Sequence, residues 1–323
     1  MSEFLSEYFN WFNQAAKALE YEVHGRLWEP PYKGLAIVGM GGSGIVGDVV
    51  YVLAIDLLDA PVTVVKDYKL PKWVEEGWLM IAVSYSGNTL ETLHVVKEGI
   101  SKGVKVAAIA SGGKLIDLTV KEDLPYIQVD SGYAPRSAFP ALLLSTLRLL
   151  KALGIKLHDD LRKSIDVLRR GEDAEALAEE VIRAVVGRIP FFIASTKYYP
   201  LAVRAKNEFN ENTKLPAKAE VVPEWGHNDI VGWEGWREPI AALVFREVDN
   251  EIMKFIAEHL KDSGFPIKEF EIEDSDYVKN ILKWSQVVGI ASVKLALELG
   301  IDPRETKSIS KYKAFLKSVL KLD

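Results

Sequence analysis

Short runs of β-branched and apolar residues alternate with longer segments of helical periodicity through the first half of the chain. Such alternation is typical of βαβ units, whose strands pair in a parallel sheet. A long apolar helix, expected over residues 138–153, closes this half before Gly154. The expected strands cover residues 35–38, 62–65, 79–84, 104–109 and 126–129.

The second half repeats the scheme, with strands expected over residues 190–195, 219–222, 239–244 and 267–272. The predicted fold class is therefore α/β, with two similar domains that each hold a doubly wound parallel sheet flanked by helices, flavodoxin-like or Rossmann-like. Residues 1–155 would hold an N-terminal helix, within residues 1–27 and packed outside the first domain, followed by that domain. Residues 156–323 would form the second domain with a C-terminal helical tail over residues 311–322.

Composition removes several classes of function. The 323 residues carry a net charge of −6 with no dense stripe of Lys or Arg, so nothing favours binding to nucleic acid or to a membrane. The acidic N-terminus lacks the basic start and apolar core of a secretory signal, and the chain has no cysteine, so we expect a cytoplasmic protein. Only three glutamines accompany 27% charged residues, which indicates a thermophilic source.

A hydroxyl-rich turn follows the third expected strand, with the sequence Ser-Tyr-Ser-Gly-Asn-Thr over residues 84–89. A helix follows it, and we expect Asn88 to cap that helix with Glu91 three residues later. The N–H groups of a first helical turn bind anions, and hydroxyls add further donors. Because the turn lacks the lysine of a nucleotide-binding Gly loop, it suits a phosphate ester better than a nucleoside triphosphate.

A glycine-rich turn over residues 39–44 follows the first expected strand. It partly mimics a dinucleotide-binding fingerprint, and Asp67 after the second strand could hold a ribose, so a dehydrogenase stays open. The glycines could also serve only close packing of helix on strand. Since the carboxyl ends of parallel strands share one edge, we expect Ser43 of this turn to lie near the hydroxyls of the later turn.

Three further groups could carry chemistry. Arg136 begins an otherwise apolar helix, where a cation opposes the helix dipole, so it should face an anion unless it is solvated. Glu208 and Glu211 share a helix face, and one carboxylate can move a proton between adjacent carbons. His227, in a loop rich in Gly and Asn, could exchange a proton with a sugar ring oxygen. Ordinary roles remain open, as solvated helix residues for the glutamates and a hydrogen-bonded loop residue for the histidine.

The five histidines do not pair four residues apart on a helix, and no cysteine accompanies them. Paired ligands of this kind are what preformed zinc sites need. We therefore predict no metal site.

The chain resembles the bifunctional phosphoglucose/phosphomannose isomerases, which are built of tandem sugar isomerase (SIS) domains, over nearly its whole length. The motifs that carry the resemblance cover residues 39–44, 84–92, 134–136, 206–212 and 289–296. The resemblance implies an aldose–ketose isomerase that interconverts glucose 6-phosphate and mannose 6-phosphate with fructose 6-phosphate by proton transfer through a cis-enediol. It also implies no cofactor, no metal, and a homodimer whose His227 reaches the partner's site.

Roles follow from the same resemblance. Glu211 would shuttle the proton, Arg136 would steady the enediolate, and His227 would open the ring. Lys313 would be a second ring-opening or substrate-contacting group, with Lys311 as its competitor. Thr306 would leave room for the mannose epimer. The residues implied to bind substrate are Gly42, Ser43, Ser84, Ser86, Thr89 and Thr306.

Three other functions remain compatible with the sequence. A non-catalytic sugar-phosphate sensor would keep the hydroxyl turn and lose the base, so Glu211 and His227 argue against it. A nicotinamide-dependent oxidoreductase would use the glycine turn. An isomerase or epimerase of another phosphosugar would use the same residues on a different substrate.

Overall fold

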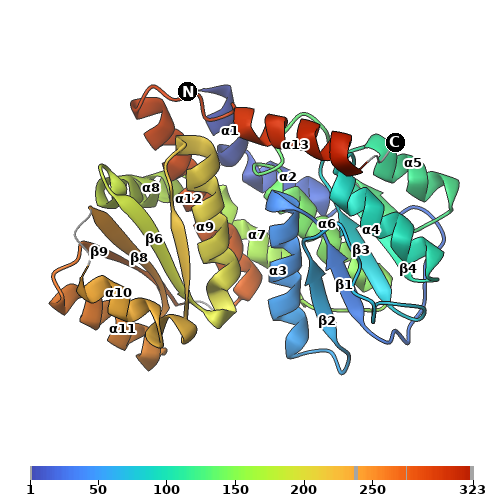
Figure 1. Cartoon of the computed structure of the whole chain (residues 1–323), viewed down its shortest axis with the longest axis horizontal. Coiled ribbons are helices and arrows are strands. Elements are labelled where there is room, and N and C mark those ends of the chain that lie inside the picture. Colours follow the sequence, from blue (N-terminus) through green and yellow to red (C-terminus); the bar gives the residue numbers. More distant parts are fainter. Residues whose placement is uncertain (1, 236–238, 274, 321–323) are drawn as a thin grey trace. The chain divides into compact units, whose positions relative to one another are not determined.

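The structure is a computed structural model that describes residues 2–235, 239–273 and 275–320 (Figure 1). Contacts divide the chain into two compact units. Unit 1 holds Met1–Phe12 and Lys163–Glu305, and unit 2 holds Asn13–Arg162 and Thr306–Asp323. Both ends of the chain are thus grouped differently from the two ranges expected from the sequence, and the domain boundary near residue 155 stays a prediction.

Unit 2 contains a five-stranded sheet in the order β2-β1-β3-β4-β5, and all its pairs are parallel. The predicted strands are confirmed within one residue at each end. They are β1 (Leu35–Val38), β2 (Val62–Val65), β3 (Leu79–Val83), β4 (Lys105–Ala110) and β5 (Tyr126–Gln128).

The helices of unit 2 cover both faces of this sheet. The connection from β1 to β2 runs one way along the sheet and that from β3 to β4 runs the other, so right-handed crossovers place their helices on opposite faces. α3 (Gly41–Ile55) packs with α6 (Phe139–Ala152), while α4 (Leu90–Ser101) and α5 (Gly113–Lys121) pack on β4. α13 (Lys307–Leu320) begins earlier than expected, and residues 321–322 of the expected tail lie outside the described residues.

Unit 1 contains a four-stranded parallel sheet in the order β7-β6-β8-β9. β9 matches its expected range, and β8 runs three residues further than expected. The strands are β6 (Ile189–Ser195), β7 (Lys218–Val222), β8 (Ile240–Glu247) and β9 (Ile267–Ile272). The longer helices are α8 (Gly171–Val185), α9 (Tyr199–Thr213), α11 (Glu251–Asp262) and α12 (Tyr277–Glu298), and the short ones are α7 (Leu161–Ile165), α10 (Asp229–Glu234) and the 3₁₀ turns η1 (Asp166–Arg169), η2 (Thr196–Tyr198) and η3 (Glu224–Gly226).

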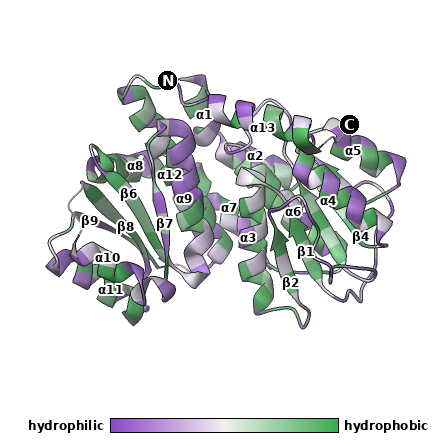
Figure 2. Ribbon diagram, in the orientation of Figure 1, coloured by the Kyte–Doolittle hydropathy of each residue, from purple (hydrophilic) through white to green (hydrophobic). Residues whose placement is uncertain are grey.

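Each sheet supplies the core of its unit. Figure 2 shows β6 and β8, the central strands of unit 1, as mainly hydrophobic. β3 is buried along its whole length, as expected for a strand covered by helices on both faces. No described helix is long and apolar enough to cross a membrane.

The N-terminal segment forms two helices, α1 (Glu3–Phe9) and α2 (Trp11–Ala18), instead of one. α1 packs on α12 in unit 1. The contact is close: a Cβ on Gly289 would lie 2.2 Å from the ring of Tyr8. The side chain of Gln286 also donates to the carbonyl of Tyr8 at 2.9 Å.

Candidate functional site

The glycine-rich turn joins β1 to α3 at the carboxyl edge of the unit 2 sheet. A Cβ on Gly39 would lie 2.8 Å from the carbonyl oxygen of Val83, so this glycine serves close packing. Ser43 is buried, and its Oγ accepts a hydrogen bond from the backbone N–H of Tyr85 at 3.2 Å. This contact joins the two expected ligand-binding turns. Asp67, the candidate ribose ligand, is exposed and accepts from the next backbone amide, that of Tyr68.

The hydroxyl-rich turn joins β3 to α4. Ser84 is buried and donates to Oγ1 of Thr89 at 3.1 Å, and the exposed Ser86 accepts from the amide of Asn88 at 3.2 Å. The expected capping by Asn88 is wrong. The Asn88 side chain is bonded instead to the carbonyl of Ser86 and the amide of Lys114. Thr89 is the N-cap residue of α4, and its side chain does not cap the helix.

Arg136 lies against the glycine-rich turn. A Cβ on Gly42 would lie 3.4 Å from the carbonyl oxygen of Pro135 and 3.5 Å from Cα of Arg136. The Arg136 side chain is only 6% exposed, which excludes the alternative of a solvated surface arginine. Unit 2 therefore brings Gly42, Ser43, the 84–89 turn and Arg136 together at the point where the helices after β1 and β3 leave in opposite directions. Ligands bind open parallel sheets at such a point.

Glu208 on α9 is buried in unit 1 within a polar network. Its carboxylate accepts from Arg204 at 2.5 Å, from the hydroxyl of Tyr8 at 2.6 Å and from Asn212 at 3.0 Å. Asn212 also donates to Ser292 of α12 at 2.9 Å. With 1% of its surface exposed, Glu208 anchors its helix and is closed to a substrate.

Glu211 is on the same helix, three residues further, and keeps partial exposure. The helix ends just beyond it at Lys214, which has φ of 59° and whose Nζ donates to the carbonyls of Glu211 and Asp302 at 2.7 and 2.8 Å. Of the two glutamates suggested by the sequence, Glu211 is thus the one that keeps part of its surface exposed.

His227 follows η3 and is exposed, and its amide donates to the carbonyl of Glu224 at 2.9 Å. The strand that leads to it, β7, holds the partly buried Glu220. Burial, helped by the nearby Asp229 and opposed by Lys218, raises the pKa of Glu220 to about 7. The Glu220 carboxyl therefore takes up and releases its proton near neutral pH, in the strand that leads to this loop.

The C-terminal candidates belong to unit 2. Thr306 precedes α13 and is partly exposed, while Lys311 and Lys313 are exposed on the helix. Nothing in their local surroundings favours one lysine over the other.

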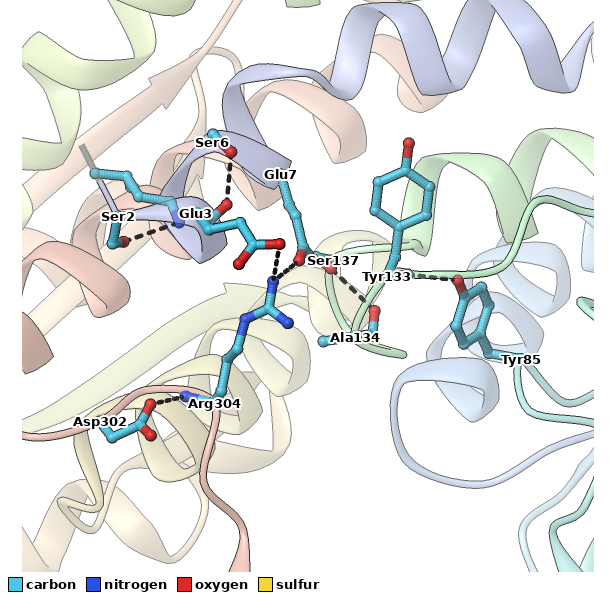
Figure 3. Close-up of polar contacts among 11 residues, drawn as sticks. Ser2, Glu3, Ser6, Glu7, Tyr85, Tyr133, Ala134, Ser137, Asp302 and Arg304 are labelled. Carbon is cyan, nitrogen blue, oxygen red and sulfur yellow. Dashed lines mark hydrogen bonds and ion pairs between the residues drawn. The ribbon is translucent and has the colours of Figure 1, made fainter.

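Four residues that the sequence analysis did not single out each connect elements within their own unit. They are Tyr8 and Arg204 of the Glu208 network, Tyr85 of the hydroxyl turn, and Arg304. Arg304 forms an ion pair with Glu7, lies 3.8 Å from Glu3, and has its amide bonded to Asp302 (Figure 3). None of these four gave a signal in the sequence; Glu7, the partner of Arg304, did so as a charged residue in an amphipathic segment.

Among the residues that the structure describes, no group of three or more His, Asp or Glu side chains is arranged to hold a metal ion. The absence of a metal from the reaction stays a prediction.

Comparison with known proteins gives three findings. Residues 172–316 match the family model of the bacterial phospho-glucose isomerase C-terminal SIS domain. A bifunctional phosphoglucose/phosphomannose isomerase from Aquifex aeolicus is 33% identical over 89% of this chain and 91% of its own length. A D-glucosamine-6-phosphate 4-epimerase from Sulfolobus acidocaldarius is 31% identical over 86% of this chain and 87% of its own.

A solved glucosamine-6-phosphate deaminase from Thermotoga maritima has the same fold, with a TM-score of 0.72 and 15% identity over 94% of this chain and 97% of that one. The two parallel sheets with their flanking helices are those of sugar isomerase domains. Within that class, the chain belongs to the bifunctional phosphoglucose/phosphomannose isomerase family.

The raised pKa of Glu220 predicts how stability depends on pH. The folded protein holds this proton more tightly than the unfolded chain, whose carboxyl has the ordinary value of 4.5, so the free energy of unfolding falls as pH rises from 4.5 to about 7. Glu220→Gln should remove this dependence and should unfold at a higher denaturant concentration than wild type at pH 8. We expect the free energy of unfolding to rise by about 1–2 kcal/mol at pH 8, which is less than the full pKa shift would give because water still screens the group. Denaturant unfolding at pH 5 and pH 8 measures it, and an equal difference between the two proteins at both pH values would contradict it.

Proposed function

We propose that this chain is an aldose–ketose isomerase that interconverts glucose 6-phosphate and mannose 6-phosphate with fructose 6-phosphate through a cis-enediol, without a metal or cofactor. The observation that carries the proposal is the near full-length similarity to the Aquifex isomerase. The meeting of a hydroxyl turn with a buried arginine in unit 2 supports it.

The substrate phosphate would bind at the carboxyl edge of the unit 2 sheet. The first N–H groups of α3 and α4 point toward that edge, and hydroxyls surround it. Arg136 would offset the negative charge that develops on the enediolate oxygens, since a buried guanidinium acts strongly where water is excluded. The hydroxyls that would hold the phosphate are those of Ser43, Ser84, Ser86 and Thr89.

Glu211 would be the base that moves a proton between C1 and C2. Its partial exposure suits the role, whereas the Glu208 carboxylate already accepts three hydrogen bonds in the core. His227 would open the sugar ring, with Lys313 as a second contact and Thr306 as the small residue that admits both epimers. A carboxylate, a charge stabiliser and a ring-opening acid are the groups that this reaction needs.

We further propose a cytoplasmic homodimer in which His227 completes the partner's site. An exposed apolar face on α13 supports association, because large apolar side chains gathered on one helix face usually mark a contact surface. The face consists of Ile309, Tyr312, Phe315 and Val319.

A second candidate is epimerisation of glucosamine 6-phosphate at C4, favoured by the 31% identity to the Sulfolobus epimerase. It would use the same phosphate anchor and differ in the carbon that reacts. The two activities are therefore separated by product analysis and not by phosphate binding.

The deciding experiment incubates the purified protein with fructose 6-phosphate, with and without EDTA, and resolves glucose 6-phosphate from mannose 6-phosphate. A parallel incubation supplies glucosamine 6-phosphate and resolves its C4 epimer. We expect both hexose phosphates from fructose 6-phosphate at a rate that EDTA leaves unchanged. Accumulation of the C4 epimer alone would replace the isomerase with the epimerase, and phosphosugar binding without any turnover would indicate a sensor.

Replacing the proposed base should stop the proton transfer alone. Glu211→Gln keeps the shape of the side chain and should lower kcat by about 10²–10⁴-fold, as expected for loss of a general base. Exchange of the C2 proton with deuterated water should stop, while inorganic phosphate should still inhibit as in wild type. The companion Glu208→Gln should instead lower the free energy of unfolding by about 3–5 kcal/mol, because Arg204 loses its buried partner. Exchange that persists in Glu211→Gln would move the base elsewhere, with Glu224 next.

Subunit mixing tests the position of His227. Glu211→Gln and His227→Ala should each be inactive. In a mixed dimer, a site completed across the interface would contain one intact Glu211 and one intact His227, whereas a site within one subunit would always keep a defect. We expect recovery of up to about half of the activity per mixed dimer, since one of its two sites is intact. Verified mixed dimers that stay inactive would place His227 in the same subunit as Glu211.

A further inference from the structure

Tyr85 connects the two halves of the unit 2 site by two different parts of the residue. Its backbone belongs to the hydroxyl turn, where the N–H donates to Ser43 and the carbonyl accepts from the amide and the hydroxyl of Ser111 at 2.8 and 2.7 Å. Its side chain, in a residue that is 6% exposed, reaches the next segment of the sheet edge. The hydroxyl donates to the carbonyl of Asp130 at 3.1 Å. It also accepts from the amide of Tyr133 at 2.9 Å (Figure 3).

The segment held by this hydroxyl leads from β5 to Arg136 and has no regular structure over residues 129–134. It is fixed from its other side as well. The amide of Asp130 donates to the hydroxyl of Tyr21 at 3.1 Å, and the Asp130 carboxylate pairs with Lys17 at 2.5 Å. Three residues after Tyr133, Arg136 begins the approach to α6. The Tyr85 hydroxyl thus bonds to the segment at Asp130 and at Tyr133, and Tyr133 is only three residues before Arg136.

We propose that Tyr85 is a positioning residue that sets Arg136 for catalysis through its hydroxyl, and this inference rests on the proposed role of Arg136. A charge stabiliser acts only where it is already aimed at the developing charge, because turning it during the reaction costs the energy that it would supply. A displacement of about 1 Å in such a group can lower a rate by about 10²-fold. The bond to Asp130 and the bond from Tyr133 restrict the segment that carries Arg136.

The same residue leaves the phosphate site intact when only its hydroxyl is removed. In Tyr85→Phe the backbone contacts to Ser43 and Ser111 remain, because none of them involves the side chain. Binding of phosphate and steering of Arg136 are therefore separable in one variant.

Tyr32 provides a matched control within unit 2. Its hydroxyl contacts two backbone carbonyls, those of Trp28 and Leu153, at 3.0 and 2.9 Å, away from the site residues. Tyr32→Phe removes a hydroxyl of similar bonding and should change stability without changing the reaction.

The test is a double-mutant cycle of Tyr85→Phe and Arg136→Ala, with kcat, KM and inhibition measured for each variant. We expect Tyr85→Phe to lower kcat by about 10-fold while the Ki of inorganic phosphate stays within about 2-fold. The Ki of 5-phosphoarabinonate, whose carboxylate mimics the enediolate, should rise by about the same factor as kcat falls. In the Arg136→Ala background the same change should alter kcat by less than about 2-fold, because residues that act together are not additive. Tyr32→Phe should keep the wild-type kcat.

The outcomes separate this inference from the function on which it rests. Full activity of Arg136→Ala would remove the proposed role of Arg136. If Arg136→Ala is impaired and Tyr85→Phe lowers kcat by the same factor with and without Arg136, the positioning role is overturned and the function stands. Tyr21→Phe, which loosens Asp130 from the other side, is the second variant if Tyr85→Phe does not fold. It should show a smaller kcat loss that also vanishes without Arg136, and an unaltered kcat would count against the proposal.

Discussion

The junction between β1 and β3 is the constraint on which the unit 2 site depends. The sheet order sends the helices after these strands in opposite directions, which opens a crevice at their carboxyl ends. The turns at this edge approach one another closely where side chains are missing, the turn after β1 against the end of β3 and the turn after β3 against the turn after β4. A Cβ on Gly87, whose φ is 64°, would lie 1.7 Å from the carbonyl oxygen of Gly112, and Gly39 faces Val83 with similar closeness. Close backbone approach leaves N–H groups and short hydroxyls as the lining, which is a surface suited to phosphate.

Unit 1 fixes its candidate base by a different means. The buried pair of Arg204 and Glu208 costs desolvation energy, so it is weak evidence for stability. Its geometry is nevertheless specific, because Glu208 accepts from α1 through Tyr8 and Arg204 lies 5.4 Å from the ring centre of Trp11. Rotation of α9 would break these contacts together. Tyr8 and Trp11 of the N-terminal segment therefore help to hold the rotational setting of the helix that carries Glu211.

The sequence was sufficient for the strands and for the turns after them, because buried parallel strands are continuous apolar runs and turns need glycine and small polar residues. It could not reveal contacts between distant segments. Asn88 is a residue type that often caps helices, yet the backbone amide of Lys114 in the next helix donates to the Asn88 side chain instead. Likewise, Glu208 and Glu211 look alike in the sequence, and only the packing of Tyr8 and Asn212 separates the buried anchor from the accessible carboxylate.

The second sheet shows why a duplicated fold need not duplicate a site. Its own reversal of strand order falls between β6 and β8, where Ser195 donates to Glu247 at 2.7 Å. A cavity of about 600 Å³ opens there, in the position that the hydroxyl turns occupy in unit 2. Its lining includes the carboxylates of Glu247, Asp249, Glu251 and Glu273. Negative charge at this edge repels a phosphate. The two sheets therefore share a topology that favours anion binding, but the side chains of unit 1 oppose such binding. The candidate residues of unit 1 therefore lie away from this cavity, Glu211 on α9 and His227 in the loop after β7.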